Sequence, residues 1–253
     1  MNYKDKLYFK ISLKRGTITG ANFYKKIFPK LWFKPVEIYL SGVTKGSVKF
    51  RERYLKKINN NKTDFSIVLS NDNNDITITE PALFETHQSE SIEFDISACG
   101  QVMAFVKEMF FNDNLMAAYL CSYYYYFTQT TEEVSHYEVF KIDIPSNFKI
   151  IKDELNWDVI DTSQNPGRFD LIPDMWLSSC GKMWFGKAFF ETKNIDVNEF
   201  VSFDNAKKIK ILNNGIVYIE LFSNPFEAYE EINMNKQQKF RDFIETLLNK
   251  NSK

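Results

Sequence analysis

The chain has 253 residues, of which 44% are hydrophobic and 16% aromatic, enough to bury a sizeable core. Its apolar runs fall short of the roughly 18 residues that span a bilayer, and its N-terminus lacks the layout of a signal peptide, so we expect a cytoplasmic protein without a membrane-spanning segment. Its three cysteines are too few and too widely spaced for a disulfide framework or a CxxC metal pair.

Charge is distributed unevenly along a chain whose net charge is only −1. Residues 1–62 carry 16 Lys or Arg against three acids, whereas residues 63–106 carry eight acids and no base. Apolar residues interrupt the basic block at spacings typical of secondary structure, so we expect the two blocks to fold against each other. The contrast also predicts a surface with patches of opposite charge, which would steer a charged partner.

The N-terminal segment has the pattern of a strand, a helix and a second strand. Residues 6–14 alternate apolar and polar side chains, which predicts a half-buried strand. A helix follows from about Thr19, a suitable N-cap, to Pro29, and a strand returns at 36–42. A short basic helix is expected next at 48–59. Two strands follow at 65–71 and 75–79, joined by an Asn-rich turn.

The same order of elements recurs further along. Residues 81–91 are polar and irregular, which indicates an exposed loop or a boundary between two similar halves. A strand begins at Ser91, a helix follows at 101–111, and a strand is expected through 115–130, a stretch that includes four consecutive tyrosines.

The chain closes with a hairpin around Asn214-Gly215 and an amphipathic helix at 235–249. Together these elements predict a single α+β domain over 1–253. We expect a mixed, largely antiparallel sheet built from two strand-helix-strand halves, with the C-terminal hairpin and amphipathic helix packed on it.

The octapeptide GKMWFGKA, residues 181–188, matches the phosphate-loop pattern except at Ala188, where the Mg²⁺-binding hydroxyl is missing. A phosphate loop joins a buried strand to a helix N-terminus, whereas this segment follows polar residues and contains bulky Met183, Trp184 and Phe185. We therefore expect a turn at Gly181-Lys182 followed by packed aromatic side chains, and no nucleotide site.

Other patterns of catalytic chemistry are equally incomplete. Cys180 loosely matches a papain-type signature, but the only candidate bases, His87 and His136, precede it in the chain, so we expect a packed thiol. No zinc or calcium pattern is present. The sequence thus predicts no catalytic residue, no metal and no cofactor, and a binding protein in place of an enzyme.

The run Tyr123 to Tyr126 is the strongest indication of an interaction surface. On a strand, Tyr123 and Tyr125 would point to one face and the next two tyrosines to the other, so that one pair lines the core and one pair is exposed. Burial of both pairs is the alternative.

Residues 169–248 contain an acidic and apolar lead with tryptophan, FDLIPDMWLSSCGKMWFGKAFF, then the strand pattern NNGIVYIELFSNPFEAY and a terminal amphipathic helix. In this order of segments the chain resembles immunity proteins of bacterial polymorphic-toxin systems, in particular the group catalogued as immunity protein fifty-two. The resemblance covers about a third of the chain and transfers no binding residue. It implies a cytoplasmic protein that binds and blocks a cognate protein toxin without catalysis of its own.

Aromatic rings and carboxylates are the side chains that would suit a basic, nuclease-like toxin. The candidate partner-binding residues are Tyr123, Tyr125, Glu227, Tyr229, Glu230 and Glu231.

Two alternatives remain open at this point. One is an intracellular nucleotide-dependent or nucleic-acid-processing enzyme, with its site between the basic block and GKMWFGKA. The other is a nucleic-acid-binding module that uses residues 1–62, with Tyr8, Phe9, Tyr24 and Trp32 stacking on bases. We expect the neighbouring acidic block to make nucleic-acid binding weak.

Overall fold

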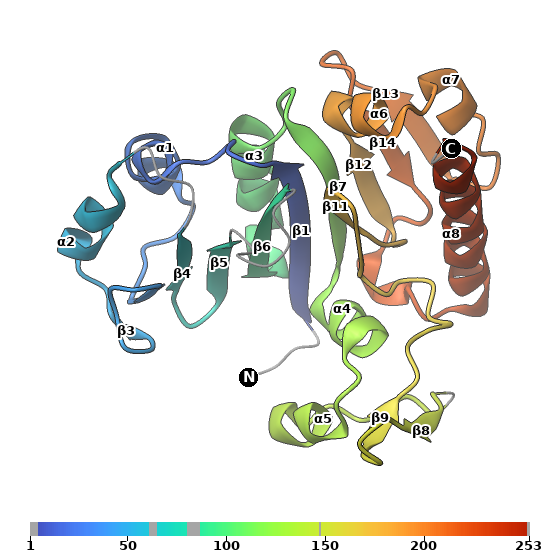
Figure 1. Cartoon of the computed structure of the whole chain (residues 1–253), viewed down its shortest axis with the longest axis horizontal. Helices are drawn as coiled ribbons and strands as arrows, with labels where there is room; N and C mark the ends of the chain where they lie inside the picture. Colours follow the sequence, from blue (N-terminus) through green and yellow to red (C-terminus); the bar gives the residue numbers. More distant parts are fainter. Residues whose placement is uncertain (1–4, 61–64, 80–86, 147, 252–253) are drawn as a thin grey trace.

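The computed structural model describes residues 5–60, 65–79, 87–146 and 148–251 (Figure 1). In this part of the chain ten strands form one antiparallel sheet, in the order β13-β14-β12-β7-β1-β6-β5-β4-β2-β3. Their bounds are β1 Lys6–Lys14, β2 Glu37–Leu40, β3 Val48–Lys49, β4 Ser66–Ser70, β5 Asn74–Thr79, β6 His87–Asp95, β7 Leu115–Ser122, β12 Lys182–Phe185, β13 Lys208–Ile211 and β14 Val217–Glu220. Two small hairpins lie outside the sheet, β8 Ile150–Lys152 with β9 Asp158–Ile160, and β10 Asp170–Ile172 with β11 Met175–Leu177.

Helices cover both faces of the sheet, and each face has its own hydrophobic core. The first face carries α1 Gly20–Asn22, the π and 3₁₀ turns η2 Phe23–Ile27 and η3 Phe28–Lys30, α2 Glu52–Leu55, η4 Lys56–Ile58, η5 Ile96–Ala98 and α3 Cys99–Met109. The second carries α4 Tyr123–Thr130, α6 Lys187–Lys193, α7 Val197–Phe200 and α8 Glu231–Asn251, while α5 Val134–Phe140 lies beyond α4. The 3₁₀ turn η6 Pro225–Glu227 packs Phe226 against the first core. The α+β fold class is confirmed.

β1 lies in the middle of this sheet and is buried on both faces. Phe9 and Ile11 point into the first core, whereas Tyr8 points into the second and is only 5% exposed. The prediction of a half-buried strand is therefore wrong, because helices cover the face that carries the alternating polar residues. Ser12 shows how a polar residue is accommodated there, since its hydroxyl accepts a hydrogen bond from Trp176 N at 3.2 Å.

Local capping signals in the N-terminal half are confirmed. The Thr19 hydroxyl accepts a hydrogen bond from Asn22 N at 3.1 Å and starts α1. The Asn71 side chain accepts hydrogen bonds from the backbone N–H groups of Asn73 and Asn74 at 3.0 and 2.9 Å, which closes the turn between β4 and β5. The segment 48–59 is only partly helical, because β3 precedes α2 and η4.

The two strand-helix-strand halves interleave within one sheet. β6 and β7 flank β1 on either side and run antiparallel to it, so they are parallel to each other and α3 connects them across β1. Of the expected loop at 81–91, residues 81–86 lie outside the described part of the chain. Residues 87–91 belong to β6 and pair with β1, so the loop interpretation is wrong for them. The pairing of β6 with both β1 and β5 makes the sheet continuous.

The C-terminal elements follow the prediction closely. Gly215, with φ of 76°, closes the β13–β14 hairpin. α8 is longer than predicted and packs its apolar stripe against the second face of the sheet, where Phe240, Ile244 and Leu247 are buried. The Phe240 and Phe185 rings lie 6.0 Å apart. None of the helices in the described ranges has both the length and the apolar character to cross a membrane.

Candidate functional site

The predicted binding residues lie where α4, η6 and the first turn of α8 meet (Figure 1). β7 ends at Ser122, whose hydroxyl accepts a hydrogen bond from Tyr125 N at 3.1 Å and caps α4. Residues 123–130 are therefore helical, and the prediction that the strand continues through the tyrosines is wrong. Tyrosine favours strands, but the N-cap and packing on several sides favour the helix here. The four rings consequently point around the helix and not alternately to two faces.

Tyr125 is fully buried, so it does not present its ring to solvent as the strand pattern suggested. Its hydroxyl donates to the backbone carbonyl of Ser179 at 3.4 Å. The ring lies so close to Gly167 that a Cβ atom at that glycine would come within 2.0 Å of the hydroxyl oxygen. Tyr125 thus holds α4 against the segment that follows β9. It does not offer a contact to a partner.

Tyr123 lies at the surface, partly exposed, on a cleft of about 430 Å³ between α4, α5 and the ends of β1, β4, β5 and β6. Four carboxylates and a single ammonium group line this acidic cleft. Its lining residues are Lys6, Val36, Glu37, Ser70, Asn71, Asp72, Asn74, Asp75, Glu93, Tyr123 and Phe140.

The charges of the acidic cleft are only partly compensated. Lys6 Nζ forms an ion pair with Glu93 Oε1 at 2.9 Å. Asp75 faces Glu93 directly across the β5–β6 pair, and burial raises the pKa of Asp75 to about 6, against a hydrogen bond from Thr77 that lowers it. Near neutral pH the cleft therefore carries an excess of negative charge and suits a cationic group.

Tyr229 connects the turn before α8 to α4. Its hydroxyl forms a hydrogen bond with the Thr128 hydroxyl and accepts another from Gln129 Nε2 at 3.1 Å. Its ring packs edge-on against Tyr124 and Tyr125, with centroids 5.9 and 5.4 Å apart. Burial raises the pKa of Tyr229 to about 12, so the hydroxyl is neutral at physiological pH and serves in hydrogen bonding. Tyr229 is partly exposed, and its main contacts are structural.

Glu227, Glu230 and Glu231 are all exposed beside Tyr229, as a partner-binding surface requires. Glu227 accepts a hydrogen bond from Asn224 Nδ2 at 2.8 Å. Glu231 occupies the first turn of α8, where a carboxylate interacts favourably with the helix dipole. Tyr123 lines the acidic cleft, and the next residue of α4, Tyr124, contacts Tyr229, so the first turn of α4 lies between this glutamate cluster and the cleft. The two acidic features share one end of the molecule.

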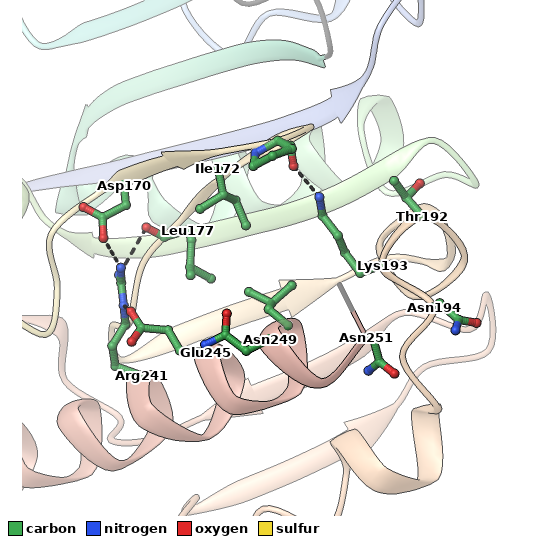
Figure 2. A pocket seen from close by; sticks show the side chains of 12 residues that line it. Asp170, Ile172, Leu177, Thr192, Lys193, Asn194, Arg241, Glu245, Asn249 and Asn251 are labelled. Carbon is green, nitrogen blue, oxygen red and sulfur yellow. Dashed lines mark hydrogen bonds and ion pairs between the residues drawn. The ribbon is translucent and has the colours of Figure 1, made fainter. Parts of the chain in front are cut away.

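A second cavity, of about 490 Å³, lies between α8, the β10–β11 hairpin and the end of α6 (Figure 2). Arg241 forms its floor: the side chain comes from α8, is 2% exposed, and forms ion pairs with Asp170 and Glu245. It also donates to the backbone carbonyls of Arg168 and Leu177 at 3.1 and 3.4 Å.

Across the same cavity, Lys193 forms an ion pair with Asp174 at 3.1 Å and donates to the carbonyl of Pro173. The charged groups of this cavity thus pair with one another, which leaves a wall of amides, one hydroxyl and apolar side chains. Sequence analysis missed this cluster, since Arg241 and Asp170 are 71 residues apart. The only local signal is the i, i+4 spacing of Arg241 and Glu245.

The segment GKMWFGKA forms β12 and the first turn of α6, with Gly186 as the N-cap. The backbone of residues 182–185 pairs with β7 and β14, so its N–H groups do not form a phosphate cradle. The expected turn at Gly181-Lys182 is wrong in that Lys182 already belongs to the strand. The aromatic side chains pack as expected, and Gly186 is required because a Cβ there would lie 2.1 Å from the carbonyl oxygen of Leu115.

The remaining candidate groups are Cys180 and the two histidines, His87 and His136. The Cys180 thiol is fully buried, with the carbonyl oxygens of Leu120 and Lys182 as possible acceptors at 3.5 and 3.4 Å. His136 is exposed and lies 3.1 Å from Glu133, and the side chain of His87 is outside the described part of the chain. Within the described ranges, no three His, Cys, Asp or Glu side chains cluster as metal ligands would.

The structure buries part of the aromatic set that was proposed to stack on nucleic acid bases. Tyr8 and Phe9 are buried in opposite cores, and Trp32 packs against Phe105 with ring centroids 5.1 Å apart. Two of the four proposed stacking residues are therefore inaccessible. The strands of the basic block do pair with those of the acidic block, as expected: β1 with β6, and β2 with β4.

Comparisons of the chain with protein-family models, curated protein sequences and solved structures found no match. The resemblance to immunity proteins therefore stays a prediction.

Proposed function

We propose that this chain is a non-catalytic binding protein, an immunity protein that neutralises a cognate toxin of basic character. The observation that carries the proposal is the placement of two acidic features at one end of the molecule. The exposed glutamates 227, 230 and 231 lie on one side of α4, and the acidic cleft lies on the other.

Surface carboxylates of this kind act mainly on the rate of association. A patch of one sign attracts a partner of the opposite sign and orients it before contact, and close ion pairs then add to affinity. The raised pKa of Asp75 supports the same idea, since a cation brought into the cleft would stabilise the ionised carboxylate.

The scaffold behind this surface is well suited to an inhibitor. α4 is held by Tyr125 in the core, by Tyr126 stacked on Tyr8 at 3.7 Å, and by Tyr229 on its other side. A binding element fixed in this way loses little conformational entropy on association, which favours tight complexes.

The test is genetic and uses the gene adjacent to that of this chain, because an immunity gene lies beside its toxin gene. Expression of the neighbouring product alone should stop growth of a host cell, and co-expression of this chain should restore it. A chain that neither binds nor protects against any adjacent gene product contradicts the proposal.

A further inference from the structure

The segment 131–161 forms a lobe that projects beyond the end of the sheet in Figure 1. It contains α5 and the β8–β9 hairpin, and we call it the acidic lobe. A small separate core formed by Tyr137, Ile142 and Ile160 packs against Phe127 of α4. The lobe thus has a fold of its own and is attached to the same helix that carries the candidate surface.

The acidic lobe displays apolar side chains that its own core does not use. Eight large hydrophobic side chains are exposed in the described part of the chain, and four of them lie in this lobe. Leu155 and Trp157, at the tip of the hairpin, are 71% and 68% exposed, and Val139 and Ile150 are 73% and 50% exposed. A tryptophan this exposed is unusual, whereas at protein interfaces it is among the residues that contribute most affinity.

The tip that presents Leu155 and Trp157 is rigid. The Asp153 carboxylate accepts hydrogen bonds from the backbone N–H groups of both, at 2.9 and 2.8 Å. Asp153 N donates to the carbonyl of Trp157 at 3.0 Å, and Asn156 adopts φ of 63° to complete the turn. The backbone that carries the two exposed side chains is therefore ordered before any partner binds.

The base of the hairpin is fixed to the rest of the lobe. Ile160 N donates to the carbonyl of Glu132 at 2.8 Å, and Asp161 N donates to the carbonyl of Lys149 at 2.8 Å. Lys152 and Asp158 form an ion pair at 2.8 Å across the strands. The hairpin thus keeps its direction relative to α4.

Charge indicates what kind of surface the tip contacts. Residues 131–161 contain eight Asp or Glu and three Lys, a balance of −5. A second copy of this chain in a symmetric dimer would bring two such lobes together, which like charges oppose. A basic surface with an apolar pocket complements the tip in both charge and polarity.

We propose that the tip of the acidic lobe docks into an apolar pocket with a basic rim on the toxin, with Leu155 and Trp157 as the anchoring side chains. This inference rests on the proposed function and adds an anchor to it. The glutamate cluster and the acidic cleft govern encounter, whereas the tip governs how long the complex persists.

The experiment measures binding of this chain and of single variants to the purified product of the adjacent gene by surface plasmon resonance, which gives both the affinity and the dissociation rate. Trp157→Ala should weaken binding by about 30-fold or more, and Leu155→Ala by about 10-fold, mainly through faster dissociation. Ile211→Ala is the matched control, because Ile211 is 56% exposed on the edge strand β13 and outside the lobe. It should bind as the wild type does. All three variants should keep the wild-type melting temperature, because the replaced side chains are exposed.

The outcomes separate the two proposals. If the wild type binds and both tip variants bind equally well, the tip is not the anchor, while the proposed function stands. If the wild type does not bind the adjacent gene product, the proposed function fails and the docking inference fails with it. Sedimentation that shows a dimer lost in Trp157→Ala would also overturn the inference, since the tip would then bind a second copy of the chain.

Discussion

Asp75 on β5 lies directly across from Glu93 on β6, and both line the acidic cleft beside Lys6. Burial raises the pKa of Asp75 from 3.8 to about 6, so the folded protein holds this proton more tightly than the unfolded chain does. The stability that Asp75 contributes is complete below pH 3.8 and is lost as the pH rises through about 6.

Asp75→Asn should therefore be more stable than the wild type at pH 7.5, by about 1–2 kcal/mol, because the amide mimics the protonated acid. The gain should shrink towards zero at pH 4. Urea denaturation at the two pH values measures this, and Asp72→Asn, at an exposed position in the turn before β5, is the control. An equal effect of Asp75→Asn at both pH values would contradict the raised pKa.

Arg241→Met tests the ion pairs that the buried Arg241 side chain forms in Figure 2. The substitution keeps an apolar stem but removes the donors to Asp170, Glu245 and the carbonyl of Leu177. Asp170 and Glu245 are 38% and 39% exposed and also pair with Arg168, so most of the cost comes from the carbonyl of Leu177, which loses its donor. We expect a loss of about 1–3 kcal/mol in the free energy of unfolding. Lys250→Met breaks the exposed pair with Glu199 and should cost less than about 1 kcal/mol. Similar losses in the two variants would mean that the Arg241 ion pairs contribute no more to the free energy of unfolding than an exposed ion pair does.

Phe240→Ala tests the packing of α8 on the sheet. Phe240 is fully buried against Phe185, Phe200 and Phe203, so its truncation should cost about 3–5 kcal/mol. Phe243→Ala should cost less, because Phe243 is only partly buried. Thermal unfolding followed by circular dichroism measures both losses. A melting temperature unchanged by Phe240→Ala would show that the helix is not held by its apolar stripe.

Calorimetry at millimolar ATP or GTP with Mg²⁺ should detect no binding. The backbone of residues 182–185 is paired in the sheet, and Lys187 is exposed, 3.5 Å from Glu191. Micromolar affinity that disappears in Lys187→Ala would reverse this prediction and favour the nucleotide-dependent enzyme.

Local signals in the sequence predicted much of the fold. The Thr19 cap, the Asn71 turn and the Asn214-Gly215 hairpin each depend on residues close together in the chain, and all three are present in the structure. Predictions were wrong where contacts between residues far apart in the sequence determine the structure. β1 has an alternating pattern but is buried on both faces. The tyrosine run is helical because Ser122 caps it and the rings of Tyr8, Phe169 and Tyr229 pack against it.

The candidate site was only partly predictable for the same reason. The exposure of Glu227, Glu230 and Glu231 follows from their charge and local setting, as predicted. The acidic cleft lies between the ends of several strands, α4 and α5. No spacing pattern in the sequence predicts which residues line it. The hairpin that presents Trp157 was missed because each of its strands has only three residues, too few for a periodic pattern.

The most direct measurement is the rate at which this chain associates with the purified product of the adjacent gene, by stopped-flow fluorescence over a series of salt concentrations. We predict a fast association that slows as salt increases. Replacing Glu227, Glu230 and Glu231 together by Lys should slow it about tenfold at low salt without changing the melting temperature. The absence of a complex with the wild type, or an association rate that neither salt nor the triple replacement alters, would contradict binding through an acidic surface.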